Sequence, residues 1–563
     1  MRQSTLPVAP RKRMARNLFD PWGLFLAILM IILIILVVYP LVTVLMNSFR
    51  DDTGTSGLGG FIQFFTSRYF LRCLVNTFVI GIGSTVLAVA VGIPFAYILN
   101  RYQVSGASFF FLAVSCGMLS PPFLGAFCWI LVFGHAGVLV KLVNDWGIAL
   151  PSIYGPVGII IVLAANAYPM VFLVVSAALK RIDPSIEEAG ATLGRSPFKV
   201  FTTITLPLLL PAILTGAMLV FLGSVADWGT ASLIGEGERF PVLATVAFST
   251  FTSEMGTEGG LSAVTSTLLL ALSMGIAAMM MFVIRKMNIS TDQPRQIPKI
   301  KLSRGSHFLV QLFLSFLVLV TCFPLVMISV FAFLQVDASV VTLNWTLDNF
   351  RAVSSELRDS LFNSIVLSGA AFVVIVYLGS LVGYLSARRK DRVTSIVDTL
   401  VMLPYFIPGT VLGIGFVYSF GAAPFYLTGT AGILVLAYIV RKLPFMVRTT
   451  ASIVTQIDRS LEEASLVLGV GPVRTFFKIM RPMMAPGISA GALLVWLEVF
   501  NELGASVVLY TAGTVTVPIM TYRYAFSYQT GSASAMGLVQ IVVTIGVFLL
   551  LRKFGEKQSL PAL

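Results

Sequence analysis

The chain has 563 residues, of which 57% are hydrophobic and only 11% are charged, and its mean hydropathy is +0.92. A soluble domain needs far more polar surface than this, so the composition excludes a soluble protein and indicates an integral membrane protein. The formal net charge is +13 at pH 7. We interpret this charge as a signal of membrane topology and not of a nucleic-acid partner.

Residues 1–20 are predicted to form a basic cytoplasmic tail, because they carry several lysines and arginines just before an apolar run. That run, at about Trp22–Met46, is too long for the apolar core of a signal peptide and lacks a small-residue cleavage site. We therefore expect it to remain in the lipid bilayer as an uncleaved anchor.

Twelve long apolar runs lie along the chain, in two sets of six separated by a polar stretch. Each exceeds the roughly 20 residues that a helix needs to cross about 30 Å of hydrocarbon. The sequence therefore predicts an all-α integral membrane protein with about twelve transmembrane helices, arranged as two parallel six-helix repeats. The runs are Trp22–Met46, Leu71–Leu99, Phe109–Phe133, Ile153–Leu179, Leu208–Ile234, Leu261–Ile284, Phe308–Leu334, Leu361–Leu385, Ile396–Phe420, Ala431–Ile453, Met483–Tyr510 and Ala535–Leu551.

Lysine and arginine are unevenly distributed between the two sets of connecting segments. If the N-terminus is cytoplasmic, the inward-facing segments hold all but about eight of the 38 Lys and Arg residues, as the positive-inside rule requires. This asymmetry predicts a multi-pass protein of a bacterial cytoplasmic (inner) membrane, with both termini in the cytoplasm.

The polar stretch 286–306 is interrupted by prolines and is predicted to be a cytoplasmic linker. It separates a first transmembrane domain, residues 21–285, from a second one, residues 307–563. The two halves share matching residues at offsets of 287 and 275, which indicates an internal duplication. The matches include Asn76-Thr77 with Asn363-Ser364, Tyr97 with Tyr384, Pro169 with Pro444, and Asp227 with Glu502.

One polar segment occurs twice, at 183–194 and again 275 residues later at 458–469. Asp183 suits a helix N-cap, and Pro184 suits the first helical position. Gly194 and Gly469 are suited to a left-handed residue that ends each helix. A second short helix is expected to follow in each copy and to end before Pro207 or Pro482, where the next span begins. Each first helix carries one apolar stripe beside its carboxylates, and we interpret the pair as docking helices for a partner protein.

These segments resemble the EAA loop of permease subunits of ATP-binding-cassette (ABC) importers. The matching residues are Glu188-Ala189-Gly190, Gly194, Ile204 and Leu206-Pro207, and again Glu463-Ala464-Ser465, Gly469, Ile479 and Arg481-Pro482. Gly190 and Ser465 replace the third alanine, and Arg481 replaces the leucine, without changing the spacing. The layout is similar to a fused two-half permease of a type I ABC importer, the MetI-like inner-membrane component.

The resemblance implies which residues couple the chain to its partners. They are Glu187, Glu188, Ala189 and Gly194 in the first copy, and Glu462, Glu463, Ala464 and Gly469 in the second. The implied partners are two copies of a cytoplasmic ABC ATPase and an extracytoplasmic substrate-binding protein. The chain has no Gly-rich nucleotide loop with its Lys-Ser/Thr, so we expect ATP and Mg²⁺ to bind the partner ATPase and this chain to be a non-catalytic transport subunit.

Several polar residues fall inside apolar runs, where charges are costly and functional by default. The candidates for the pathway or for receptor contact are Asp227, Glu498, Asn501, Glu502, Arg441 and Lys442. Alternatively, the acidic residues end helices at the level of the lipid headgroups. Arg441 and Lys442 stand where the first half has Asn166 and Ala167; they face the pore, pair with Glu498, or snorkel to the interface. No catalytic or metal-binding constellation is predicted.

The layout resembles permeases of the ferric-iron uptake group most closely, and also those for 2-aminoethylphosphonate, thiamine or polyamine. Ferric ion is a hard cation that favours oxygen ligands, and the few buried carboxylates permit brief contact without forming a cage. The same residues together with Arg441 and Lys442 equally suit an anionic phosphonate. The residues leave the cargo open, and iron is ranked first on the resemblance alone. An ion-gradient secondary transporter is the alternative class, but it leaves the repeated docking segment unexplained.

Overall fold

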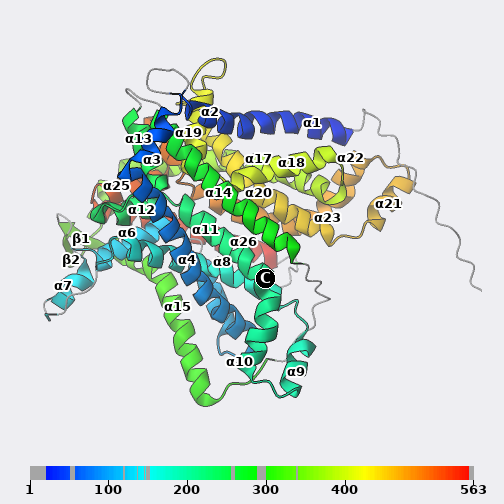
Figure 1. The fold of residues 1–563 in the computed structure, drawn as a ribbon, viewed down its shortest axis with the longest axis horizontal. Helices are drawn as coiled ribbons and strands as arrows, with labels where there is room; N and C mark the ends of the chain where they lie inside the picture. The colour runs from blue at the N-terminus through cyan, green and yellow to red at the C-terminus, as the bar shows by residue number, and fades with distance from the viewer. Residues whose placement is uncertain are drawn as a thin grey trace, which may run out of the picture.

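A computed structural model describes residues 21–50, 57–117, 121–135, 137–144, 146–147, 152–254, 260–287, 299–337 and 340–556. The predicted tail at 1–20 lies outside these residues, as does most of the predicted linker at 286–306. Helices form nearly all of the described chain (Figure 1).

The first half consists of helices that include three π-helical or 3₁₀ segments, at Ile34–Val38, Phe201–Thr205 and Glu236–Glu238. The helices are α1 (Pro21–Leu33), α2 (Tyr39–Asn47), α3 (Gly59–Thr66), α4 (Arg68–Arg101), α5 (Ala107–Gly117), α6 (Pro122–Phe133), α7 (Val138–Asn144), α8 (Pro156–Leu179), α9 (Pro184–Thr192), α10 (Pro197–Val200), α11 (Leu206–Ala226), α12 (Gly229–Gly235), α13 (Leu243–Glu254) and α14 (Gly260–Lys286).

The second half repeats this order and adds a short hairpin after its first helix. Its elements are α15 (Arg304–Phe331), β1 (Leu334–Asp337), β2 (Val340–Trp345), α16 (Asp348–Ala352), α17 (Ser354–Arg388), α18 (Arg392–Met402), α19 (Gly409–Phe420), α20 (Ala431–Thr455), α21 (Ser460–Val467), α22 (Pro472–Thr475), α23 (Arg481–Phe500), α24 (Ser506–Leu509), α25 (Val517–Phe526) and α26 (Thr530–Glu556).

Within the described residues, ten helices are long and apolar enough to cross a membrane, or eleven if one bent pair counts as a span. The bent pair joins Arg392–Phe406 to Gly409–Phe420 at 112°, because Pro408 cannot continue a helix from the residues before it. The remaining predicted run, Ala431–Ile453, forms α20, which is long enough to cross a membrane but carries Arg441, Lys442 and Arg448. The exact number of twelve spans stays a prediction.

Four predicted runs are each divided between two helices. The run Phe109–Phe133 is divided between α5 and α6, and Ile396–Phe420 is the bent pair. The run Leu208–Ile234 divides into α11 and α12, and Met483–Tyr510 divides into α23 and α24. The breaks occur at Pro121, at Pro408, and at the acidic residues Asp227 and Glu502, so proline and a helix-capping carboxylate end these helices where hydropathy alone does not.

The prediction of an all-α protein misses one element, the hairpin of β1 and β2. These strands pair antiparallel, with Leu334 opposite Trp345 and Val336 opposite Val341. The segment Val340–Trp345 is rich in β-branched residues, which favour strands. The predicted run Phe308–Leu334 accordingly ends as a helix at Phe331, and Leu334 begins β1.

Two equivalent groups of three long helices form the centre of the protein. In the first half α4, α8 and α11 pack against one another, and in the second half α17, α20 and α23 do the same (Figure 1). The first helix of each half packs on the opposite half. Trp22 of α1 contacts Tyr384 and Phe476 edge-on, with ring centroids 6.5 and 5.7 Å apart, and Thr321 of α15 lies 2.6 Å from the hydroxyl of Tyr168 in α8.

Short helices fold back at one end of the bundle and are held by a repeated polar pair. Asn76 donates to the carbonyl of Pro241 at 2.8 Å, and the hydroxyl of Thr77 accepts the backbone N–H of Leu243, the first residue of α13. In the second half Asn363 donates to Val515, and Ser364 accepts the N–H of Val517 at the start of α25. The Asn-Thr/Ser repeat thus fastens one short helix in each half.

Helices α9 and α21 lie toward one end of the molecule, and the hairpin, α7, α13 and α25 lie toward the other (Figure 1). The repeated segments therefore share a side of the bundle, as a parallel repeat requires. Their assignment to the cytoplasmic side, and that of both termini, remains a prediction.

Candidate functional site

The first repeated segment forms α9, capped as its sequence predicts. The Asp183 carboxylate accepts the backbone N–H of Ser185 at 2.9 Å, and Gly194 has a φ of +79° just after the helix. The prediction that a separate second helix ends before Pro207 is wrong. Instead α10 continues through the π-helical segment into α11, so that Pro197–Ala226 is one continuous helix. The π-helical segment Phe201–Thr205 directly before Pro207 interrupts the regular hydrogen-bond ladder and accommodates the proline within the helix.

The second repeated segment forms α21 with the same geometry. The Asp458 carboxylate accepts the backbone N–H of Ser460 at 2.9 Å, and this hydrogen bond lowers the pKa of Asp458. Gly469 has a φ of +78°. Here too the predicted break before Pro482 is absent, and Pro472–Phe500 is one helix.

The two adjacent glutamates of each segment point in different directions. Glu187 accepts from Arg101 at 2.9 Å and from the hydroxyl of Thr205 at 2.8 Å. Glu462, its equivalent, accepts from Arg388 at 2.6 Å and from the Tyr384 hydroxyl at 2.9 Å. These bonds fasten each short helix to the end of α4 or α17.

The following residues, Glu188 and Glu463, are exposed and belong to no ion pair recorded for the described chain. Ala189 and Ala464 are also exposed. Each segment therefore has one glutamate that is bound within the protein and one that is exposed without an ion pair among the described residues.

The departures from the EAA pattern have local causes. A Cβ on Gly190 would lie 2.7 Å from the terminal methyl group of Ile204, so glycine suits the close packing of α9 on the next helix. Ser465 at the equivalent position is buried and lies 2.8 Å from the hydroxyl of Thr475. Both residues pack the short helix on the span that follows it.

Large apolar side chains are exposed at the far end of both segments. Leu193 and Leu468, the last residues of the two predicted stripes, are 82% and 81% exposed. Phe198 and Val467 beside them are exposed as well. The stripe is thus buried at its start, at Ile182, and open at its end.

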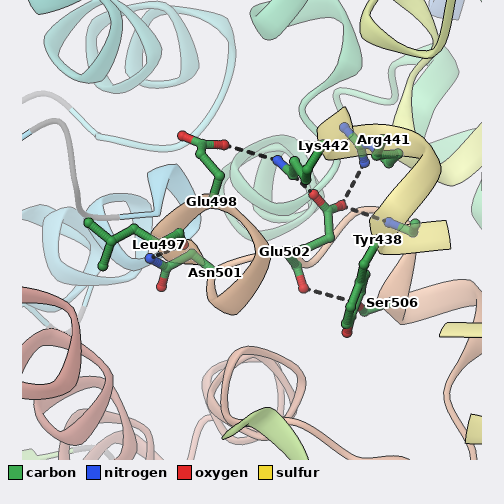
Figure 2. Close-up of polar contacts among 9 residues, drawn as sticks. Tyr438, Arg441, Lys442, Leu497, Glu498, Asn501, Glu502 and Ser506 are labelled. Carbon is green, nitrogen blue, oxygen red and sulfur yellow. Dashed lines mark hydrogen bonds and ion pairs between the residues drawn. The ribbon is translucent and has the colours of Figure 1, made fainter. Parts of the chain in front are cut away.

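Four charged residues of the second half form one cluster (Figure 2). Arg441 of α20 donates to Glu502 at 2.6 Å, and Lys442 lies 3.0 Å from the other oxygen of Glu502 and 2.9 Å from Glu498. The backbone N–H of Ala505 also donates to Glu502, at 3.2 Å. Of the predicted alternatives, the pairing with Glu498 is made by Lys442, whereas Arg441 binds Glu502.

Space for Arg441 comes from two glycines. A Cβ on Gly409, at the start of α19, would overlap the guanidinium, and one on Gly504 would lie 3.2 Å from it. Sequence reasoning missed both glycines, and it missed Arg101 and Arg388 as partners of the coupling glutamates. The pair Arg101 and Arg388 is separated by the same offset of 287 as Tyr97 and Tyr384, so the repeat contained a signal for it.

Asp227 and Asn501 have other surroundings. The Asp227 carboxylate accepts the backbone N–H of Thr230 at 2.7 Å and caps α12, as Glu502 does for the backbone at Ala505. Asn501 donates to Leu497 and accepts from Gln540 of α26 at 2.8 Å. The structure therefore brings Glu498, Glu502, Arg441 and Lys442 together and leaves Asp227 and Asn501 outside the cluster. No group of three His, Cys, Asp or Glu suited to hold a metal ion occurs in the described ranges.

Comparison with known proteins gives two matches to one family, at residues 88–289 and 375–559. The family is described as the binding-protein-dependent transport system inner membrane component. The matches cover more than half of the chain. This protein belongs to that family.

The relatives of this permease are named as permease proteins of transport systems. It is 27% identical over 542 residues to the ferric transport system permease protein FbpB of Actinobacillus pleuropneumoniae, covering 93% of this chain and 77% of the relative. It is 26% identical to the Fe(3+)-transport system permease protein FbpB 2 of Haemophilus influenzae, covering 86% and 90%. The molybdate/tungstate permease WtpB of Pyrococcus abyssi is 28% identical over 36% of this chain and 83% of the relative.

Membership in this family makes the protein a multi-pass permease component of an ABC importer. The ion-gradient secondary transporter is therefore set aside. A permease of this kind implies an ATPase and a binding protein as partners in general, and the transport chemistry belongs to the assembly and not to this subunit.

Proposed function

We propose that this permease imports ferric iron across a bacterial inner membrane. An extracytoplasmic binding protein delivers the ion, and two copies of a cytoplasmic ATPase dock on α9 and α21 to drive its passage. The observation that carries the proposal is the similarity to ferric permeases over almost the whole chain, at 27% identity across 93% of it.

The exposed residues of the two repeated segments, 183–194 and 458–469, support their assignment as docking sites. Leu193 and Leu468 are exposed next to the free carboxylates of Glu188 and Glu463. An exposed apolar end flanked by a charge suits a protein cleft, since burial of the leucine supplies affinity and the charge sets register. The same arrangement in both halves supports two docking sites.

The anchored glutamates give the docked helices a route to the membrane. Glu187 is tied to Arg101 at the end of α4, and Glu462 to Arg388 at the end of α17. Because α4 and α17 each span the bundle, a displacement of α9 or α21 by an ATPase is passed directly to one central helix of each half.

Molybdate or tungstate is less well supported as the cargo. The molybdate/tungstate relatives match only 34% to 42% of the chain, whereas the ferric relatives match 86% or more. No contact in the described residues favours 2-aminoethylphosphonate, thiamine or polyamine over iron.

Reconstitution tests the proposal. Proteoliposomes that contain the permease, its ATPase and the binding protein are given radioactive ferric ion, and parallel samples receive molybdate, phosphonate, thiamine or polyamine. We expect ATP-dependent uptake of iron alone. Uptake of another of these solutes in place of iron would overturn the cargo, and accumulation under an ion gradient without ATPase would overturn the mechanism.

Docking is tested separately by cysteine crosslinking at Ser185 and Ser460, which are exposed beside the two N-caps. In a background without the native cysteines, both positions should crosslink to the ATPase. Labelling of either one from outside intact cells would contradict the assigned topology.

A further inference from the structure

The charge cluster occurs in one half only, although the two halves share their fold. By the offset of 275, the first-half equivalents of Arg441, Lys442 and Glu498 are Asn166, Ala167 and Gly223. The first half forms the same helices without these charges. The fold therefore does not require the cluster, which indicates a function that is specific to the second half.

The two cations of the cluster lie near the middle of α20. At 1.5 Å per residue, Arg441 is about 15 Å from the Ala431 end of α20 and about 21 Å from its Thr455 end. A charge at this depth is stable only if it is paired or faces a water-filled space.

The two carboxylates of the cluster differ in exposure and in partners. The Glu502 side chain is 4% exposed and binds Arg441, Lys442 and the backbone of Ala505. The Glu498 side chain is 47% exposed, and Lys442 is its sole recorded partner among the described residues. Arg441 and Lys442 are only 19% and 9% exposed. The most exposed group of the cluster is therefore a carboxylate, and Figure 2 shows its contact with Lys442.

The surroundings indicate what Glu498 faces. Contact of an ionised carboxylate with hydrocarbon is costly, which favours water as the surroundings of its exposed part. Gly223, the equivalent residue of α11, is also exposed, and a Cβ there would meet nothing within 4 Å. The same position is therefore uncovered in both halves.

We propose that Glu498 is a cation-selecting contact for cargo in the transport pathway, with Lys442 as its exchangeable internal counter-ion. Lys442 lies 2.9 Å from Glu498 and 3.0 Å from Glu502. A passing cation replaces Lys442 at Glu498 while Lys442 keeps Glu502, so no buried charge is left unpaired.

The inference rests on the proposed function and deepens it by fixing the sign of the cargo. A carboxylate as the open group favours a hard cation with oxygen ligands. Because Arg441 and Lys442 are mostly buried behind the carboxylates, the open group that an anionic phosphonate or molybdate would meet is itself a carboxylate, and the site does not attract such a cargo.

The test measures iron uptake and ATP hydrolysis in the same proteoliposomes, with the ATPase and the ferric-loaded binding protein present. Glu498→Gln should lower uptake about tenfold, the effect of about 1.4 kcal/mol on a barrier, while hydrolysis stimulated by the binding protein persists. Glu498→Asp should retain most of the uptake. Glu356→Gln is the matched control, because this exposed glutamate at the start of α17 lies outside the cluster.

A double variant separates cargo contact from a structural ion pair. If Glu498 served only to neutralise Lys442, removing both charges in Lys442→Met/Glu498→Gln would restore uptake. We expect uptake to stay low. Restoration, wild-type uptake by Glu498→Gln, or an equal loss of ATP hydrolysis would each overturn the inference alone. Absence of iron uptake by the unaltered chain would overturn the proposed cargo as well.

Discussion

Adjacent glutamates in each coupling segment differ because one is satisfied internally. Glu462 accepts from Arg388 at 2.6 Å and from the Tyr384 hydroxyl at 2.9 Å, and both side chains of the ion pair are mostly buried. Glu463, one residue later, is exposed. The pair provides two chemically identical positions with opposite expected roles.

Replacing Glu462 by Gln should lower the free energy of unfolding by about 3 kcal/mol, since it leaves the Arg388 charge without its counter-ion in a mostly buried site. Glu463→Gln is the control and should leave stability unchanged. Thermal unfolding of the detergent-solubilised protein measures both. Equal midpoints for the two variants would show that the anchor contributes nothing.

Charge reversal at the exposed glutamates should act on coupling. Glu188→Lys and Glu463→Lys place a positive charge at the positive end of a helix dipole and on the docking face. We expect ATP-driven uptake to fall steeply in the double variant while its thermal stability stays close to that of wild type. Wild-type uptake would contradict the docking role of this face.

The loop after α21 contains two glycines in different conformations, which permits a direct comparison. Gly469 has a φ of +78°, whereas Gly471, two residues later, has an ordinary extended backbone and open space for a Cβ. Gly469→Ala should cost about 1 kcal/mol and lower uptake, because an L side chain disfavours the left-handed region. Gly471→Ala should have little effect on uptake or on thermal unfolding. A reversed order would disprove the stated role of the turn.

At the scale of elements, local signals predicted some features well. The caps of α9 and α21 depend on residues within a few positions of each other, so Asp183, Gly194 and Gly469 could be assigned from the sequence. The continuity of α10 with α11 could not, because a proline accommodated inside a helix beside a π-helical segment and a proline that ends a helix look alike in a sequence.

The short helices and the charge cluster depend on distant residues. α13 begins where Thr77, 166 residues earlier, accepts its first N–H. Glu502 meets Arg441 across 61 residues, and no local pattern reports such a contact. The sequence therefore identified the polar residues as functional candidates but could not decide which of them meet.

The contact between Thr77 and α13 should be important for stability. Thr77→Val keeps the shape but leaves the buried N–H of Leu243 without its acceptor, at a cost of about 1–3 kcal/mol. Thr85→Val is the matched control, because the Thr85 hydroxyl donates within its own helix, to Gly81. Thermal unfolding compares them, and an equal loss in both would argue against a special role for the repeated Asn-Thr/Ser pair.

At the scale of the molecule, the exchange of first helices links the halves near the coupling sites. Trp22 of α1 contacts Tyr384 and Phe476, and Tyr384 itself donates to Glu462 of α21. A helix from the first half therefore supports the anchor of the second coupling segment. Conformational changes in the second segment are expected to reach the first half through this contact.

Trp22→Ala should loosen α21 more than α9. Truncation of a buried tryptophan costs about 3–5 kcal/mol where the cavity cannot close, and the packing lost here lies against the ring that bonds Glu462. Hydrogen exchange of the purified protein should rise in 460–467 and change little in 184–192. Trp146→Ala serves as the control, since Trp146 is exposed and follows α7 in the sequence, and α7 lies toward the other end of the molecule from α9 and α21 (Figure 1). Equal loosening of both segments would mean that α1 stabilises the bundle generally and gives the second coupling site no particular support.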